Sequence, residues 1–404
     1  MSQSIEAVSR FRCFSTSPRG LFYLLLLSGG FAIALFGAVP GAVAQLTILH
    51  SFGDGTVPND GSDPRDGLIQ TPDGTFYGVT LFHAGRAGAR GVIFSITSSG
   101  TYSIPKNYAH PSFTSAPLYY NKKLIGTYYG QNAKNAGVLF SLSGYPNGPW
   151  LSHVWHVFTG EPADGEDPVG RLILGSDGNL YGVTEIGGSA NQGTIYKVNP
   201  KSHAVEIVYS FPSNSSLLRP STGLLLAADG NFYGAAEAVG NNPGEIYKMT
   251  PSGAVTTFYQ FTGSGFPWGA LIQGSDGNFY GTAVGTSSNM SFVYRLTPRG
   301  VLKVLHKFTP TQGPGVITTG VVQGPNGYLY GLSWGDGTGG MGTVYELSTD
   351  GSTFNVLHYF GDGSVPNDGK DPDGILTVGT DGNLYGVTTS GGSAGNGTVF
   401  KISP

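Results

Sequence analysis

The chain of 404 residues repeats one unit of roughly fifty residues, and this repetition limits the possible folds more than any other feature. In the last copy the unit reads GILTVGTDGNLYGVTTSGGSAGNGTVFKIS, residues 374–403. The glycine of its second apolar segment recurs seven times at intervals of 47 to 56 residues, at Gly78, Gly126, Gly182, Gly234, Gly281, Gly331 and Gly386. Seven units of this length are typical of the blades of a β-propeller.

Each unit contains four segments with the composition of β-strands. The third segment carries an aromatic residue at one fixed place, namely Phe94, Phe140, Tyr196, Tyr247, Tyr294, Tyr345 and Phe400. A fourth segment ends in an aromatic residue, as at Phe211 and Phe360. Glycine and Asp-Gly-Asn turns separate the segments, which is typical of tight hairpins. The sequence therefore predicts an all-β protein, a seven-bladed β-propeller with four-stranded blades.

The two ends of the repeated region complement each other. The seventh copy stops at Pro404 after its third strand, whereas LTILHSF, residues 46–52, has the pattern of a fourth strand with no blade before it. Pairing of this N-terminal strand with the last blade would leave no open sheet edge. We therefore expect residues 45–404 to form a single seven-repeat propeller domain that is closed in this way.

The first 44 residues have the three parts of a signal peptide. Arg10, Arg12 and Arg19 precede an apolar run, residues 21–39, and Ala42-Val43-Ala44 offers a cleavage site with small residues. We expect cleavage after Ala44 and a secreted or extracytoplasmic protein, in the periplasm or at the cell surface. The alternative is a retained membrane anchor, because the apolar run approaches the length that spans a bilayer.

Charge and cysteine content exclude several classes of partner and site. The formal net charge is −4, and it becomes −6 without residues 1–44, which hold three arginines and one glutamate. Nucleic acid is therefore an unfavourable partner, and we expect membrane contact only through the signal peptide before cleavage. The one cysteine, Cys13, precedes the predicted cleavage site, so disulfides, thiolate metal sites and cysteine nucleophiles are not expected in the mature chain. We expect a monomer.

The run GNLYGVTTSGGSAGNGTVFKI, residues 382–402, resembles the GloVer tandem repeat of bacterial choice-of-anchor proteins. The resemblance extends over about residues 46–404 and is weakest in the second copy. It implies an extracytoplasmic bacterial protein, and it brings no catalytic residues with it.

Histidines recur at one place in the fourth strand, at His50, His156, His306 and His358, and Tyr209 and Tyr259 occupy the same place in other copies. A zinc site needs three or four ligands that converge on one ion. Side chains distributed one to a blade do not converge, so we interpret these histidines as structural.

Three loops between units are rich in oxygen ligands and share the pattern Asp-Gly-x-Asp-Pro, as in residues 60–64, 164–168 and 368–372. Two of them flank the closing blade, so we expect a ligand-binding face there, formed by Asp54, Asp60, Asp63, Asp66, Asp362, Asp368, Asp371 and Asp373. Carboxylates suit calcium, which we consider possible at Asp60, Asp63, Asp368 and Asp371. The alternative is that these loops are self-contained Asx turns that end in proline.

No set of residues indicates a catalytic site, so we assign no catalytic residue and no certain cofactor. The leading hypothesis is an exported, non-enzymatic binding or scaffold module whose extracellular ligand is a glycan or a protein. The alternative is a carbohydrate-active hydrolase or lyase, because propellers carry both kinds of function. A glycosidase would need two carboxyl groups about 5 to 9.5 Å apart across one cleft.

Overall fold

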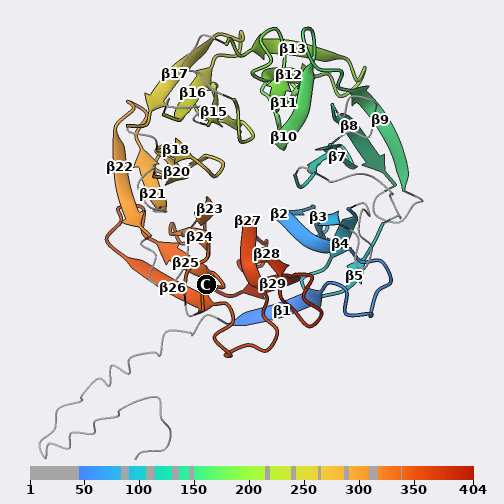
Figure 1. Ribbon diagram of the computed structural model, residues 1–404, viewed down its shortest axis with the longest axis vertical. Coiled ribbons are helices and arrows are strands. Elements are labelled where there is room, and N and C mark those ends of the chain that lie inside the picture. Colours follow the sequence, from blue (N-terminus) through green and yellow to red (C-terminus); the bar gives the residue numbers. More distant parts are fainter. Residues whose placement is uncertain are drawn as a thin grey trace, which may run out of the picture. The chain divides into compact units, whose positions relative to one another are not determined.

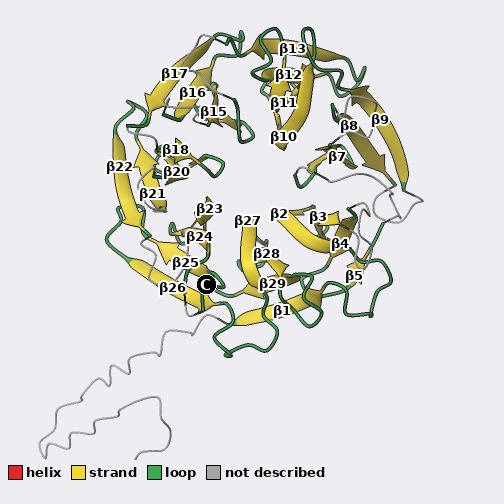
Figure 2. Ribbon diagram, in the orientation of Figure 1, coloured by secondary structure: helices red, strands yellow, loops and turns green. Residues whose placement is uncertain are grey.

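A computed structural model describes residues 45–82, 91–105, 113, 115–129, 136–144, 150–213, 219–237, 243–262, 265–285, 291–308, 317–337 and 339–404. These residues form strands, turns and loops, and they contain no helix (Figure 2). The strands form seven antiparallel sheets arranged in a ring around a central axis (Figure 1). This arrangement is the predicted seven-bladed β-propeller. The predicted signal peptide, residues 1–44, lies outside the described residues.

Each blade is built from four strand positions, counted outward from the axis. The innermost strands are β2 (Ser62–Gln70), β6 (Leu118–Tyr120), β10 (Gly165–Leu174), β14 (Leu225–Leu226), the pair β18 (Phe266–Pro267) and β19 (Ile272–Gln273), β23 (Ile317–Gln323) and β27 (Lys370–Val378). The second strands are β3 (Phe76–Phe82), β7 (Lys123–Tyr128), β11 (Leu180–Gly187), β15 (Phe232–Ala236), β20 (Phe279–Val284), β24 (Leu329–Trp334) and β28 (Leu384–Ser390). We number the blades 1 to 7 in this order.

The third strands are β4 (Ile93–Ile96), β8 (Val138–Ser143), β12 (Thr194–Val198), β16 (Glu245–Met249), β21 (Ser291–Leu296), β25 (Thr343–Leu347) and β29 (Thr398–Ile402). The outermost strands are β5 (Tyr102–Ser103), β9 (Leu151–Val157), β13 (Val205–Ser210), β17 (Val255–Gln260), β22 (Leu302–Lys307), β26 (Phe354–Tyr359) and, in blade 7, β1 (Leu46–Ser51).

The predicted closure is confirmed. The sheet of blade 7 has the order β1-β29-β28-β27, so its outermost strand comes from the start of the repeated region. Leu46 pairs with Ile402 and Ser51 with Thr398. The strand β1 thereby covers the edge of β29, which would otherwise be unpaired.

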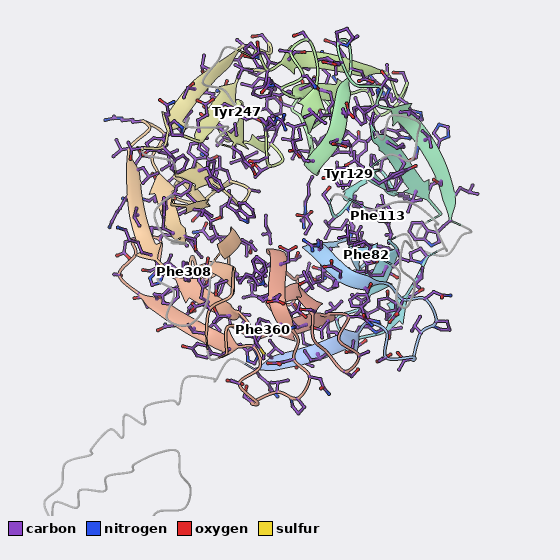
Figure 3. All side chains as sticks on the ribbon, in the orientation of Figure 1. Phe82, Phe113, Tyr129, Tyr247, Phe308 and Phe360 are labelled. Atoms are coloured by element: carbon purple, nitrogen blue, oxygen red, sulfur yellow. The ribbon has the colours of Figure 1, made fainter. Side chains whose placement is uncertain are left out.

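The repeated glycine and the repeated aromatic residue face each other across the second and third strands of every blade. Gly182 pairs with Tyr196, and a Cβ atom on Gly182 would lie 2.5 Å from the Tyr196 ring. These rings are among the most deeply buried side chains. Figure 3 labels one of them, Tyr247, together with Phe308 and Phe360, which directly follow the outermost strands β22 and β26. Glycine recurs because the ring occupies the space of its side chain.

The hydrophobic core lies mostly between neighbouring blades. One buried cluster joins Phe52, Leu68 and Phe76 to Tyr385 and Val387, and so connects blade 1 to blade 7. Burial of these side chains favours a ring in which every blade has two neighbours. Among the described residues, no helix is long and apolar enough to cross a membrane.

Candidate functional site

A bulge in the innermost strand brings side chains to the axis. In blade 1, Arg65 pairs with Val79 and Ile69 with Tyr77, so the three residues 66–68 lie opposite the single residue between Val79 and Tyr77. Blades 3 and 7 have the same irregularity. The extra residues are accommodated by turns of positive φ, as at Gly374, where a Cβ atom would lie 2.6 Å from the Cα atom of Asp66 in the next blade.

One position at the start of this bulge carries a different residue in each of blades 1, 3, 4, 5 and 7. In three blades this residue pairs with the one after the repeated glycine, and it is Arg65, Val169 or Asp373. In two further blades the backbone N–H of Ser221 or Trp268 donates to the carbonyl of the residue after the repeated glycine. The repeat therefore keeps the backbone constant while it varies the side chains around the axis. Such variation is the freedom that a binding site needs on a rigid scaffold.

These side chains line two adjoining cavities on the axis. The larger has a volume of about 380 Å³ and includes Asp66, Arg171 and Ser221 in its wall. The smaller has a volume of about 140 Å³. Trp268 and Asp373 belong to both walls, so the two cavities form one axial site that opens at the face where the innermost strands begin.

Arg171 closes the site on the side of blades 1 to 3. Its Nε donates to Asp66 Oδ2 at 3.0 Å, its Nη1 donates to the Leu68 carbonyl at 3.4 Å, and its Nη2 donates to the Asp66 carbonyl. The Ala116 N–H donates to the same carboxylate oxygen at 2.8 Å. Arg171 also lines a separate cavity beside Gln70, toward the other face, so it forms part of the wall between the two.

Two exposed tryptophans line the smaller cavity. Trp268 is 42% exposed and Trp334 is 46% exposed, although large aromatic side chains are normally covered. Trp334 Nε1 donates to Asp371 Oδ1 at 2.6 Å, and Ser390 Oγ donates to Asp371 Oδ2 at 2.7 Å. These bonds hold Asp371, and through it the indole of Trp334, in a fixed place.

Asp373 lies between the two cavities with incomplete charge compensation. Burial is the main reason that the pKa of Asp373 is raised, and the negative charges of Asp66 and Asp63 raise it further. The positive charge of Arg65 acts in the opposite direction and lowers the pKa. The Arg65 guanidinium is 3.9 Å from Asp373, whereas it contacts Asp63 twice, at 3.0 and 3.1 Å. Arg65 is therefore paired first with Asp63.

Further carboxylates surround the same face at blades 3 and 4. Burial raises the pKa of Asp167, and the charges of Glu166 and Glu185 raise it further. Burial likewise raises the pKa of Glu237, the charge of Glu185 adds to this, and Arg219 acts against it. Mutual repulsion of this kind means that the face carries a negative potential.

Of the predicted ligand-binding residues, Asp60 and Asp368 are buried away from the axis. His50 Nε2 donates to Asp60 Oδ2 at 2.9 Å, and His358 Nε2 donates to Asp368 Oδ2 at 2.7 Å. Each carboxylate also accepts a backbone N–H, from Gly53 in one loop and from the corresponding glycine in the other. Both side chains tie their loop to the outermost strand of the preceding blade.

The histidines of the fourth strand fit this structural role. His50 pairs with Val399, and His156 and His358 occupy the same position in their own blades. His156 donates to Asp164 at 2.9 Å. The interpretation of these three histidines as structural therefore agrees with their contacts.

The other predicted residues divide into two groups. Asp54 and Asp362 are exposed and bind the N–H two residues ahead, at 2.8 and 2.7 Å, in Asx turns. Asp63, Asp66, Asp371 and Asp373 gather at the axial site. In the described residues, no group of three or more His, Cys, Asp or Glu side chains is placed to hold a metal ion, and calcium binding by the loops stays a prediction.

The two tryptophans, Arg65 and Arg171 are not among the site residues predicted from the sequence. A signal for two of them is present in the repeat. Arg65 and Trp268 occupy the position of the innermost strand that varies between blades, where a purely structural repeat has no need of an arginine or an exposed indole.

Comparisons with known proteins agree with the fold. The model of the Gloeobacter/Verrucomicrobia repeat family matches residues 106–290 and 266–404. A search among curated proteins found no match.

Solved structures with a similar fold have diverse activities. Puromycin hydrolase is 15% identical with a TM-score of 0.56, over 82% of this chain and 53% of that one. Kuenenia stuttgartiensis hydrazine synthase is 14% identical with a TM-score of 0.54, over 87% and 98%. An oligogalacturonate lyase in complex with manganese is 11% identical with a TM-score of 0.53, over 89% and 93%. At such identities the likeness is one of fold.

Proposed function

The chain belongs to the Gloeobacter/Verrucomicrobia repeat family, and from that premise we propose that it is an exported binding module that holds a polyhydroxylated ligand, a glycan, at the axial site. The observation that carries the proposal is the pair of exposed tryptophans, Trp268 and Trp334, in the wall of one cavity with hydrogen-bonding groups. A ligand pocket combines apolar contact area with a few placed polar groups.

The chemistry of the wall suits sugar rings. An indole face covers the apolar side of a ring, while carboxylates and hydroxyls bond the hydroxyl groups at its edge.

Binding is better supported than catalysis. Asp66 is occupied by Arg171 and the Ala116 N–H, and Asp371 is occupied by Trp334 and Ser390. A glycosidase needs one carboxyl group that donates a proton and a second that acts as nucleophile or base. The raised pKa of Asp373 would suit the proton donor, but the contacts of Asp66 and Asp371 do not favour either of them as the second group.

The test is a glycan array with the purified protein, followed by incubation with each polysaccharide that binds. We expect binding without turnover. Release of reducing or unsaturated sugar ends, lost in Asp373→Asn, would favour the hydrolase or lyase alternative. Failure to bind any glycan would contradict the proposal.

The exported location is part of the same proposal. It rests on the basic, apolar and small-residue segments of residues 1–44. N-terminal sequencing of protein recovered outside the cytoplasm should begin at Gln45. A membrane fraction that retains residues 21–39 would show an anchor instead.

A further inference from the structure

The positive groups of the axial site are already neutralised by carboxylates. Arg171 is 3.0 Å from Asp66 and also contacts two backbone carbonyls of blade 1. Arg65 makes a two-point contact with Asp63, at 3.0 and 3.1 Å. Neither guanidinium is therefore available as a primary partner for an anionic ligand.

Two carboxylates in the same wall, those of Asp371 and Asp373, have no guanidinium or ammonium group within 3.5 Å among the described residues. Asp371 accepts hydrogen bonds from two neutral donors, the Trp334 indole and the Ser390 hydroxyl. Asp373 is one-third exposed, and the nearest guanidinium atom is 3.9 Å away and belongs to Arg65. Both carboxylates line the cavity of about 140 Å³ together with Trp268 and Trp334.

Resting on the proposed function, we infer that the axial site selects a glycan that carries protonated amino groups, an amino sugar, over a neutral or acidic one. A cation on an aromatic face is attracted by the π-electrons of the ring, and most strongly by tryptophan. The same cation would gain charge-assisted hydrogen bonds from Asp371 and Asp373. The carboxylates around Asp167 and Glu237 would draw a chain of such sugars across the face.

The composition of the cavity distinguishes an ammonium group from the other cations. In the described residues, no group of three or more acidic or histidine side chains is placed to hold a metal ion. Calcium takes six to eight oxygen ligands, whereas an ammonium group needs only two or three acceptors and gains from an aromatic surface. A uronate would place its carboxylate against Asp371 and Asp373 and be repelled.

The experiment compares three oligosaccharides of equal length by calorimetry at pH 6: oligomers of glucosamine, of N-acetylglucosamine and of galacturonate. We expect the amine to bind about tenfold more tightly than the acetylated sugar, which is the scale of one desolvated cation contact. Asp373→Asn should reduce this preference several-fold without loss of the neutral sugar. Asp362→Asn removes the same charge from an exposed turn outside the cavity and should leave the preference unchanged.

Each contrary result has a separate meaning. Equal affinity for amine and acetylated sugar, or tighter binding of the uronate, would overturn the selectivity but leave glycan binding intact. A lysine oligomer of equal charge that binds as tightly as the amino sugar would show a polycation site without sugar recognition, and it would also overturn the inference. Failure of all three oligosaccharides would instead count against the proposed function itself.

Discussion

Trp334 Nε1 donates a hydrogen bond of 2.6 Å to Asp371 Oδ1, and this contact links blade 6 to blade 7 at the wall of the axial cavity. Trp334 ends the second strand of its blade, and nearly half of its surface is exposed. An indole that is held at its edge offers its ring as a rigid contact surface, which reduces the entropy lost on binding.

Replacing Asp371 by alanine should release this indole. We expect the affinity for a bound glycan to fall several-fold. The free energy of unfolding should fall by about 1 kcal/mol, which is the usual net contribution of one hydrogen bond. Tryptophan fluorescence anisotropy and urea unfolding measure the two effects. Asp362→Ala, in an exposed turn, serves as the control. Unchanged anisotropy and affinity would show that Asp371 does not position Trp334.

The ionised carboxylate of Asp373 should lower the free energy of unfolding at neutral pH. Because its pKa is raised, the folded protein binds more protons than the unfolded chain between the ordinary carboxyl pKa and the raised value. The free energy of unfolding therefore falls as the pH rises through this interval, and it stays lower above it. Asp373→Asn should remove the cost and add about 0.5 kcal/mol at pH 7, a small value because solvent screens a partly exposed group.

The comparison is made by urea unfolding of the original protein and the Asp373→Asn variant at pH 7 and near pH 3. The gain should be present at pH 7 and absent at about pH 3, below the ordinary carboxyl pKa of about 3.9. A variant that is less stable at pH 7 would mean that the carboxylate of Asp373 stabilises the fold.

The buried pair of His358 and Asp368 should be important for stability, because both side chains are nearly inaccessible to solvent. Among the described residues, His358→Ala leaves the Asp368 carboxylate with the N–H of Gly361 as its one donor, and we expect a loss of about 2 to 3 kcal/mol in the free energy of unfolding. His153→Ala, at an exposed position of β9, is the control. Equal unfolding midpoints for the two variants would contradict the structural role of the pair.

Closure by the N-terminal strand should decide the stability of the ring. Phe52 is fully buried and contacts Phe94 and Tyr102. Phe52→Ala should cost about 3 to 5 kcal/mol, and deletion of residues 46–52 more, because it also opens an edge of the last blade. Phe82→Ala, at an exposed residue, is the control. Thermal unfolding of the deletion variant at the temperature of the intact protein would exclude this account of closure.

The fold could be predicted because it repeats. Gly182 opposite Tyr196 is one of seven such pairs, so one recognised copy explained the others. The pairing of His50 with Asp60 was also visible in principle, because a histidine and an aspartate recur ten residues apart at His358 and Asp368. Contact between the histidine and the aspartate depends on how the loop folds back on the strand, which the sequence pattern alone does not predict.

The axial site was harder to predict for a physical reason. Whether Trp268 and Arg65 face the axis depends on the bulge in the innermost strand, which shifts the alternation of side chains. If side chains are assumed to alternate strictly between the two faces along β2, the residues around Asp66 are assigned to the wrong face. The density of aspartates drew attention to the face at which the axial site opens. Four of the eight predicted residues, Asp54, Asp60, Asp362 and Asp368, serve turns and buried pairs instead.

The central claim, that the axial tryptophans hold a glycan, is tested most directly by titrating the protein and its Trp268→Ala variant with the oligosaccharide that binds best in the array. Loss of one stacking side chain at the centre of a site should weaken binding by about tenfold or more. Tyr359→Ala removes an exposed aromatic side chain from the outermost strand β26 and should leave the affinity unchanged. Equal affinity for Trp268→Ala and Tyr359→Ala, with both variants folded, would contradict the account.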